Sequence, residues 1–236
     1  MCDTAAMKHP TRLTDIAARI GRPHHSTKDA PMYALYDQYF ADLVDQPVTL
    51  LELGVYTGES LKVFASFFER GTLIGVDVED RHVDLSDYPN ALFTLGDQRS
   101  AEQLDTICAA HAPGGLDIVI DDASHYGAWS WRSYEILFPH LKRGGLYIVE
   151  DWATGYWDDW LDGSRYQEFP AVPRDGEPPK RLPSHDFGMV GFVKRLVDEA
   201  VWHGIRPSIN APCTQPRKLE WMHVHPEFVA LRKSRD

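Results

Sequence analysis

Two short stretches of this sequence combine acidic and imidazole side chains at points where an apolar run ends. The first is D-D-A-S-H, in which Asp121 and Asp122 close the run LDIVI and His125 follows three residues after Asp122. The second is E-D, formed by Glu150 and Asp151, which closes the run LYIV. Carboxylates attract cations and imidazole suits proton transfer near neutral pH, so these residue types could support acid–base chemistry.

Each stretch also has an ordinary structural interpretation. Two acids after a strand often cap the following helix or form a solvated turn, and a nearby histidine can be a surface or core residue. Asp121 in particular is expected either to face a cofactor or to cap the next helix. The presence of both stretches at the ends of successive predicted strands favours a shared chemical role.

The elements that must position these residues alternate between strand and helix. Runs typical of strands cover residues 48–54, 72–78, 91–97, 116–122 and 144–151. Helical spacing covers residues 11–21, 32–44, 60–70, 101–111, 129–142 and 189–204. The alternation predicts an α/β fold, a Rossmann-like parallel sheet with helices on both faces. Ligands of such sheets bind beyond the carboxyl ends of the strands, and all five predicted ends carry a carboxylate.

The chain is expected to form a single domain over residues 1–236. Its predicted parts are an N-terminal helical or lid segment (1–47), a cofactor-binding core (48–151), a flexible flap (152–190) and a C-terminal helix with strands (191–236). Residues 158–187 are rich in Pro, Gly, Trp and charge, which predicts a long lid-like insertion after the fifth strand.

Three further features have alternative interpretations. The aromatic residues of 152–160 could stack on an apolar or sugar substrate, or form a packed flap or subunit interface. The loop with His24, His25 and Asp29 could close over the site or be an exposed linker. The C-terminal residues predict two short strands around His225-Pro226. His223 and His225 would share one face of a strand there, and we expect them to be structural residues.

Composition excludes several classes of protein. The 236 residues carry a formal net charge of -11, which argues against nucleic-acid binding and against a polybasic membrane-surface protein. No apolar run is long enough to span a bilayer, and the first residues do not form a secretory signal. The three cysteines are far apart and odd in number, so we expect free thiols and a cytoplasmic protein.

The loop after the first strand, E-L-G-V-Y-T-G-E-S, is expected to line a cofactor. Gly54 would let the backbone pass close to a ligand, and Gly58 would open the following helix, near Ser60. Tyr56 replaces the middle glycine of a dinucleotide fingerprint, which disfavours a nicotinamide cofactor. The carboxylate of Glu52 would repel a pyrophosphate but attract an ammonium group.

The next two strand ends complete a description of that cofactor. Asp77, about 20 residues beyond the first glycine, is placed to bind a ribose diol. Asp97 and Gln98 could bind the exocyclic amine of adenine. A cationic ligand with ribose and adenine but no phosphate is S-adenosylmethionine.

At this point the sequence resembles the class I methyltransferases, through E-L-G-V-Y-T-G and V-D-V. D-D-A-S-H followed by L-F-P-H-L-K-R-G-G-L-Y-I-V-E-D resembles, more closely, the metal-dependent sugar O-methyltransferases of natural-product biosynthesis. The resemblance implies that Asp122, Glu150 and Asp151 hold Mg²⁺ or another divalent cation and that His125 is the general base. It also implies a glycosylated small-molecule acceptor and a homo-oligomer. Ala123 stands where the family usually has glycine, a departure that bears on the identity of the acceptor more than on the chemistry.

Other functions remain open at this stage. The acceptor could be a catechol, or the protein could serve in a β-lactam hydroxylase-type pathway. It could also be a non-catalytic partner subunit that keeps the fold and binds S-adenosylmethionine. The complete set of acids and histidine argues against the last of these.

Overall fold

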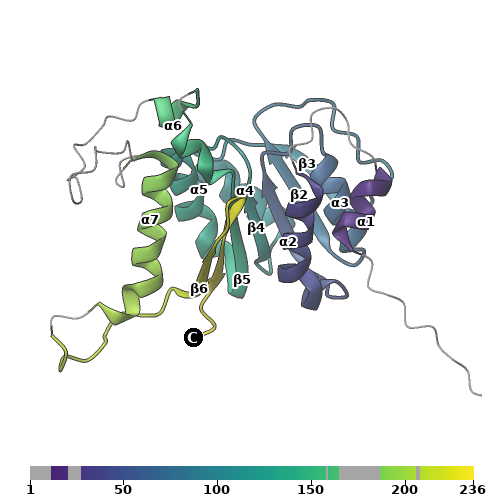
Figure 1. The fold of residues 1–236 in the computed structure, drawn as a ribbon. Helices are drawn as coiled ribbons and strands as arrows, with labels where there is room; N and C mark the ends of the chain where they lie inside the picture. The colour runs from purple at the N-terminus through teal and green to yellow at the C-terminus, as the bar shows by residue number, and fades with distance from the viewer. Residues whose placement is uncertain (1–11, 21–27, 158, 165–186, 206–207) are drawn as a thin grey trace, which may run out of the picture.

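A computed structural model describes residues 12–20, 28–157, 159–164, 187–205 and 208–236 of the chain. Its strands are β1 (Thr49–Leu53), β2 (Thr72–Asp77), β3 (Ala91–Leu95), β4 (Leu116–Asp121), β5 (Leu141–Glu150), β6 (Leu219–Val224) and β7 (Phe228–Lys233). They form one seven-stranded sheet in the order β3-β2-β1-β4-β5-β7-β6 (Figure 1). The first five strands are parallel, as predicted. β6 and β7 are the predicted C-terminal strands, and β7 runs antiparallel to β5.

The helices cover both faces of the sheet, as the alternation predicted. The α-helices are α1 (Leu13–Ile20), α2 (Ala30–Phe40), α3 (Glu59–Phe67), α4 (Ala101–His111), α5 (Gly127–His140), α6 (Leu161–Ser164) and α7 (Gly188–Val201). The 3-10 helices are η1 (Ala41–Leu43), η2 (Trp152–Tyr156) and η3 (Trp202–Gly204). Buried side chains of α1, α2 and α3 pack on one face, and those of α4, α5 and α7 pack on the other (Figure 1).

The α5–β5 boundary differs from the prediction by a few residues. The helix was expected over 129–142 and the strand over 144–151. α5 instead ends at His140, and β5 begins at Leu141, which pairs with Leu116 before the register shifts. Pro139 lies in the last turn of α5, where it lacks the N–H that would bond to the preceding turn, and the helix ends one residue later.

Parts of the predicted organisation lie outside the described residues. These include His24, His25 and most of the insertion expected over 158–187. Among the helices that are described, none is both long enough and apolar enough to cross a membrane.

Candidate active site

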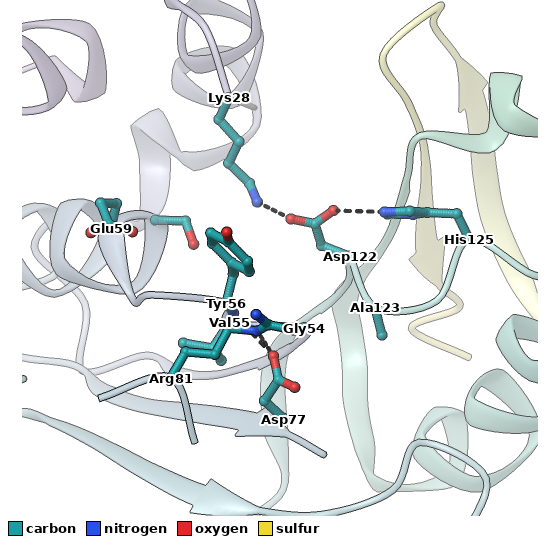
Figure 2. Close-up of a pocket in the computed structure, with 11 residues that line it drawn as sticks. Lys28, Gly54, Val55, Tyr56, Glu59, Asp77, Arg81, Asp122, Ala123 and His125 are labelled. Atoms are coloured by element: carbon teal, nitrogen blue, oxygen red, sulfur yellow. Dashed lines mark hydrogen bonds and ion pairs between the residues drawn. The ribbon is translucent and has the colours of Figure 1, made fainter. Parts of the chain in front are cut away.

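Two cavities lie at the carboxyl ends of the central strands. The larger, which we call the Tyr56 cavity, has a volume of about 440 Å³ and is lined by residues that include Lys28, Tyr56, Arg81, Asp122 and His125 (Figure 2). The other, the Trp129 cavity, has a volume of about 340 Å³ and is lined by residues that include Gln98, Arg99 and Trp129. Both share Gly54, Asp77 and Ala123. They meet at the ends of β1 and β4, where the strand order reverses: β2 follows β1 on one side and β5 follows β4 on the other. Such a switch point is where folds of this kind bind ligands.

The close approach of Gly54 to a ligand stays a prediction, and Gly54 lines both cavities. The packing of the protein also requires glycine here, because a Cβ at Gly54 would lie 2.1 Å from the Asp122 carbonyl oxygen, and the residue has φ +81°. The loop after β1 therefore passes directly against the D-D-A-S-H turn, and only glycine fits there.

Asp77 fixes the shape of the same loop. Its Oδ2 accepts hydrogen bonds from the backbone N–H groups of Val55 (2.9 Å) and Tyr56 (3.0 Å), and its Oδ1 accepts one from Glu79. The predicted ribose partner is thus also the anchor of the first loop. Its carboxylate still lines both cavities.

The remaining loop residues occupy the expected places. Gly58, with φ +91°, is the N-cap of α3, and Ser60 lies in the first turn of that helix and lines the Tyr56 cavity. Tyr56 has φ +51° and a half-exposed ring beneath the Arg81 guanidinium, 4.9 Å from the ring centre. Tyr56, Ser60 and Arg81 therefore line the Tyr56 cavity, and Gly58 starts the helix behind it.

The Trp129 cavity contains the two residues predicted for adenine. Asp97 is held by Arg99, whose Nε lies 2.9 Å from its Oδ1, and the resulting side-chain hydrogen bonds lower the Asp97 pKa. Gln98 is buried and donates weakly to Asp121 and Ser133, both at 3.4 Å. Trp129 also lies in the wall of this cavity, with the Arg99 guanidinium 4.2 Å from the centre of its ring.

Asp121 is a buried structural residue. Its Oδ2 accepts a 2.6 Å hydrogen bond from the Ser133 hydroxyl in the second turn of α5. The N-cap of α5 is Tyr126, so the predicted capping role of Asp121 is wrong. Contact between Asp121 and a cofactor remains a prediction. In the structure, Asp121 accepts a hydrogen bond from Gln98, which itself lines the Trp129 cavity.

A buried lysine that our sequence analysis missed connects three strand ends. The Lys28 ammonium lies 3.3 Å from Glu52 Oε1, 3.1 Å from Glu150 Oε2 and in direct contact with Asp122 Oδ2. Glu150 also accepts a 2.5 Å hydrogen bond from the buried Tyr36 hydroxyl of α2. Burial raises the pKa of the Glu52 carboxyl, although the charge of Lys28 opposes this, and Glu52 Oε2 has no hydrogen-bond partner among the described residues.

Asp122, His125 and Asp151 form a second group beside this lysine. One ligand atom from each lies within 4.8 Å of the others, an arrangement that could hold a metal ion. His125 Nε2 is 3.8 Å from both Asp122 Oδ1 and Asp151 Oδ2, too far for a hydrogen bond to either. His125 (φ +49°) and Asp151 (φ +51°) both have left-handed backbones, a strain that clusters at functional sites.

The backbone turns at the end of β5 and separates the two neighbouring acids. β5 ends at Glu150, and Asp151 begins η2 with its left-handed conformation. Asp151 faces Asp122 and His125, whereas Glu150 faces Lys28 and Tyr36. Of the three predicted metal ligands, the structure therefore groups Asp122 with Asp151 and places Glu150 in the neighbouring cluster.

Burial and charge shift the pKa values of these groups. Burial would lower the Lys28 pKa, but the carboxylates of Asp122, Glu150 and Glu52 outweigh it and hold that pKa well above its usual value. Burial, and then the charge of Asp122, raise the pKa of Glu150 strongly and that of Asp151 less. The contribution of Asp122 to both shifts is a repulsion between carboxylates that a bound cation would relieve, and carboxylate oxygens are ligands that suit a divalent metal.

An aromatic wall borders His125 on the side of η2. The Trp160 ring lies 5.9 Å from the His125 ring, and its Nε1 donates to the His125 carbonyl at 3.2 Å. Trp157, about half exposed, packs edge-on against Trp160. Part of the predicted aromatic stretch therefore lies beside the candidate base.

His223 and His225, which the sequence predicted to share a face, both form hydrogen bonds with Tyr39. The Tyr39 hydroxyl lies 3.0 Å from His223 Nδ1 and 2.7 Å from His225 Nε2, so the two imidazoles share a face as predicted. Among the described residues no third metal-ligating side chain joins them. Asp29, of the predicted N-terminal polar loop, caps α2 by accepting from Met32 N.

Residues 51–152 match the protein family described as a methyltransferase domain. Together with the sheet order, this match shows that the chain has the Rossmann-like fold of methyltransferases. The curated relatives include the mycinamicin VI 2''-O-methyltransferase of Micromonospora griseorubida, 34% identical over 85% of this chain and 47% of the relative. They also include the 8-demethyl-8-alpha-L-rhamnosyl tetracenomycin-C 2'-O-methyltransferase of Streptomyces olivaceus, 35% identical over 85% of this chain and 49% of the relative.

A solved structure supports the same relationship. The MycE methyltransferase of the mycinamycin pathway, in complex with Mg and SAH, superposes with a TM-score of 0.71 and 30% identity over 96% of this chain and 55% of that chain. The chain is therefore a homologue of these O-methyltransferases, which confirms the resemblance in the sequence. It spans about half the length of the curated relatives it matches.

Proposed function

We propose that this chain methylates a hydroxyl group of a glycosylated small natural product, using S-adenosylmethionine and a divalent cation, with Mg²⁺ as the expected ion. The observation that carries the proposal is that two cavities meet at Gly54, Asp77 and Ala123, next to the group formed by Asp122, His125 and Asp151. The homologous O-methyltransferases, and the Mg and SAH in the MycE complex, support the same chemistry.

The cofactor would lie across both cavities. The adenine would occupy the Trp129 cavity, near Asp97 and Gln98, and the ribose would bind Asp77, which lines both cavities. The methionine part would extend past Gly54 and Tyr56 towards Ser60, in the Tyr56 cavity. Glu52, the predicted partner of its ammonium group, is fully buried and paired with Lys28, so it would act on that group only from behind the cavity wall. These assignments place the sulfonium methyl group beside Asp122.

His125 would act as the base in the transfer. The acceptor oxygen forms a bond to the methyl carbon, the carbon–sulfur bond breaks and its electron pair stays on sulfur, and the hydroxyl proton passes to His125 Nε2. Asp122 and Asp151, with Glu150 beside them, would hold the metal. When bound, the metal supplies a Lewis acid that lowers the pKa of a hydroxyl and orients it.

The acceptor would lie against Trp160. Its reacting hydroxyl must reach His125, and the Trp160 ring is 5.9 Å from that imidazole. The C–H face of a sugar ring can stack on an indole, whereas a catechol would stack with its own aromatic ring. Trp157 extends this surface towards solvent.

Calorimetric titration tests the cofactor first. S-adenosylmethionine and its demethylated product are titrated into the protein with Mg²⁺ and with chelator. Binding of both forms is expected, and binding of neither would refute the methyltransferase proposal. NAD serves as a negative control.

Transfer is then tested with methyl-labelled S-adenosylmethionine. Acceptors are supplied as matched pairs of a glycosylated natural product and its aglycone, together with a catechol. Label on the glycosylated member alone supports the proposal. Label on the catechol supports the rival acceptor, and cofactor binding without any transfer supports the non-catalytic partner. A cytoplasmic location and a homo-oligomer remain predictions, to be tested by fractionation and by light scattering.

A further inference from the structure

Lys28 is a cation inside a site expected to bind another cation. It directly precedes the N-cap of α2, and only 3% of its surface is exposed. Its three acidic partners come from the ends of β1, β4 and β5, which are far apart in the sequence. The Lys28 ammonium donates hydrogen bonds to Glu52 and Asp122 and is ion-paired with Glu150 at 3.1 Å. All three acids therefore contribute to holding its charge in the buried site.

Asp122 lies between this lysine and the candidate metal group. Its Oδ2 contacts Lys28, and its Oδ1 faces His125 Nε2 at 3.8 Å (Figure 2). Both contacts use one short carboxylate, so a metal held with Asp151 must share Asp122 with the lysine. Glu150, which the resemblance assigns to the metal, has Oε2 on Lys28 and Oε1 on Tyr36.

Two cations that share carboxylates weaken each other's binding. They repel one another over a short distance, and water screens this repulsion poorly in a buried site. An ammonium group on Asp122 Oδ2 and Glu150 Oε2 also withholds those oxygens from a metal. The charge of Lys28 therefore opposes metal binding, although it stabilises the acids when no metal is present.

We propose that Lys28 is an internal competitor of the divalent metal, a positioning residue that sets metal affinity through its hold on Asp122 and Glu150. Because Lys28 precedes α2, the N-terminal segment thereby acts on the metal site. The inference rests on the metal of the proposed function, but not on the identity of the acceptor.

The test compares Mg²⁺ affinity by calorimetry in the wild-type chain and in Lys28→Met. The expected result is binding at least roughly tenfold tighter in the variant, because one repelling charge is lost and two carboxylates are released. Lys28→Arg keeps the charge and should stay near the wild type. Lys142→Met is the matched control, since Lys142 is ion-paired with Asp117 (2.8 Å) at the opposite end of β4.

A second measurement covers the case in which Lys28→Met folds poorly without metal. Thermal unfolding is recorded with Mg²⁺ and with chelator, and the Mg²⁺-induced rise in Tm should be larger in Lys28→Met than in the wild type or Lys142→Met. Equal or weaker Mg²⁺ binding together with an equal Tm rise would overturn the proposal. If no variant binds Mg²⁺ but all bind S-adenosylmethionine, this inference and the metal fail while the cofactor assignment stands.

Discussion

The two halves of the site, on either side of Gly54, are built in different ways. Beyond β1 and β2, the loop is held by hydrogen bonds from backbone amides to Asp77. Beyond β4 and β5, charged side chains face one another around Lys28 and Asp122. The first half has a shape that depends little on which ligand is present. The second depends on a balance of charges, so substitutions there should change turnover more than cofactor binding.

The sharpest test of this difference is Asp122→Asn, which keeps the size of the side chain and removes its charge. Turnover should fall roughly thousandfold, about 4 kcal/mol, because the metal loses a ligand. Binding of S-adenosylmethionine should change by about threefold or less, because the cofactor loop is held by hydrogen bonds to Asp77 and not by the charge of Asp122. Single-turnover kinetics and calorimetry measure the two effects. An equal loss of cofactor affinity would show that the halves are not separable.

His125→Gln should have the next largest effect. Removal of a general base costs on the order of a hundredfold in kcat. Mg²⁺ affinity, measured by calorimetry, should stay at the wild-type value. A clear loss of Mg²⁺ affinity would identify the imidazole as a metal ligand, as the grouping with Asp122 and Asp151 permits.

Gly54→Ala tests the contact that joins the two halves. The added Cβ would meet the Asp122 carbonyl oxygen at 2.1 Å in a backbone with φ +81°, so the free energy of unfolding should fall by about 2–3 kcal/mol. Gly114→Ala is the control, because nothing lies within 4 Å of its added Cβ. Urea denaturation compares them, and similar stability would contradict the close packing.

Trp160→Ala tests where the acceptor binds in the second half of the site, the half beyond β4 and β5. The KM for the glycosylated acceptor should rise about tenfold with the KM for S-adenosylmethionine unchanged, since stacking on the indole is lost. Trp202→Ala, in η3, is the control. An unchanged acceptor KM would remove Trp160 from the acceptor site.

The smallest expected effect is that of Arg99→Ala in the cofactor half. Its guanidinium covers Trp129, and its loss should weaken S-adenosylmethionine binding by about threefold without changing kcat. Arg70→Ala removes another exposed guanidinium and controls for the change in net charge. A fall in kcat would show that this half also contributes to the chemical step.

The fold was largely predictable because its signals are local. The apolar runs and their spacing predicted the five parallel strands, and acids at their ends predicted where the cavities lie. The resemblance implied that the neighbouring acids Glu150 and Asp151 hold one metal ion, but it did not reveal how the backbone orients them. In the structure, the left-handed backbone at Asp151 directs the two side chains to different partners.

Lys28 could not be predicted in the same way. Its partners lie 24, 94 and, for Glu150, more than a hundred residues away, and no periodic pattern connects them. The available signal was a lysine between a polar loop and an apolar helix, which is common at helix starts. The same holds for Arg99 and Trp129, whose contact depends on how β3 and α5 meet in three dimensions.

The position of β7 has a consequence for how the protein is made. β5 carries Glu150 at its end, and its outer neighbour is β7, one of the last elements in the sequence. During synthesis on the ribosome, β5 emerges well before β7 and must wait with an unpaired edge, which is open to wrong partners. A stalled or prematurely ended chain would therefore contain the cofactor loop but leave the acid-bearing strand uncovered, a form prone to aggregate.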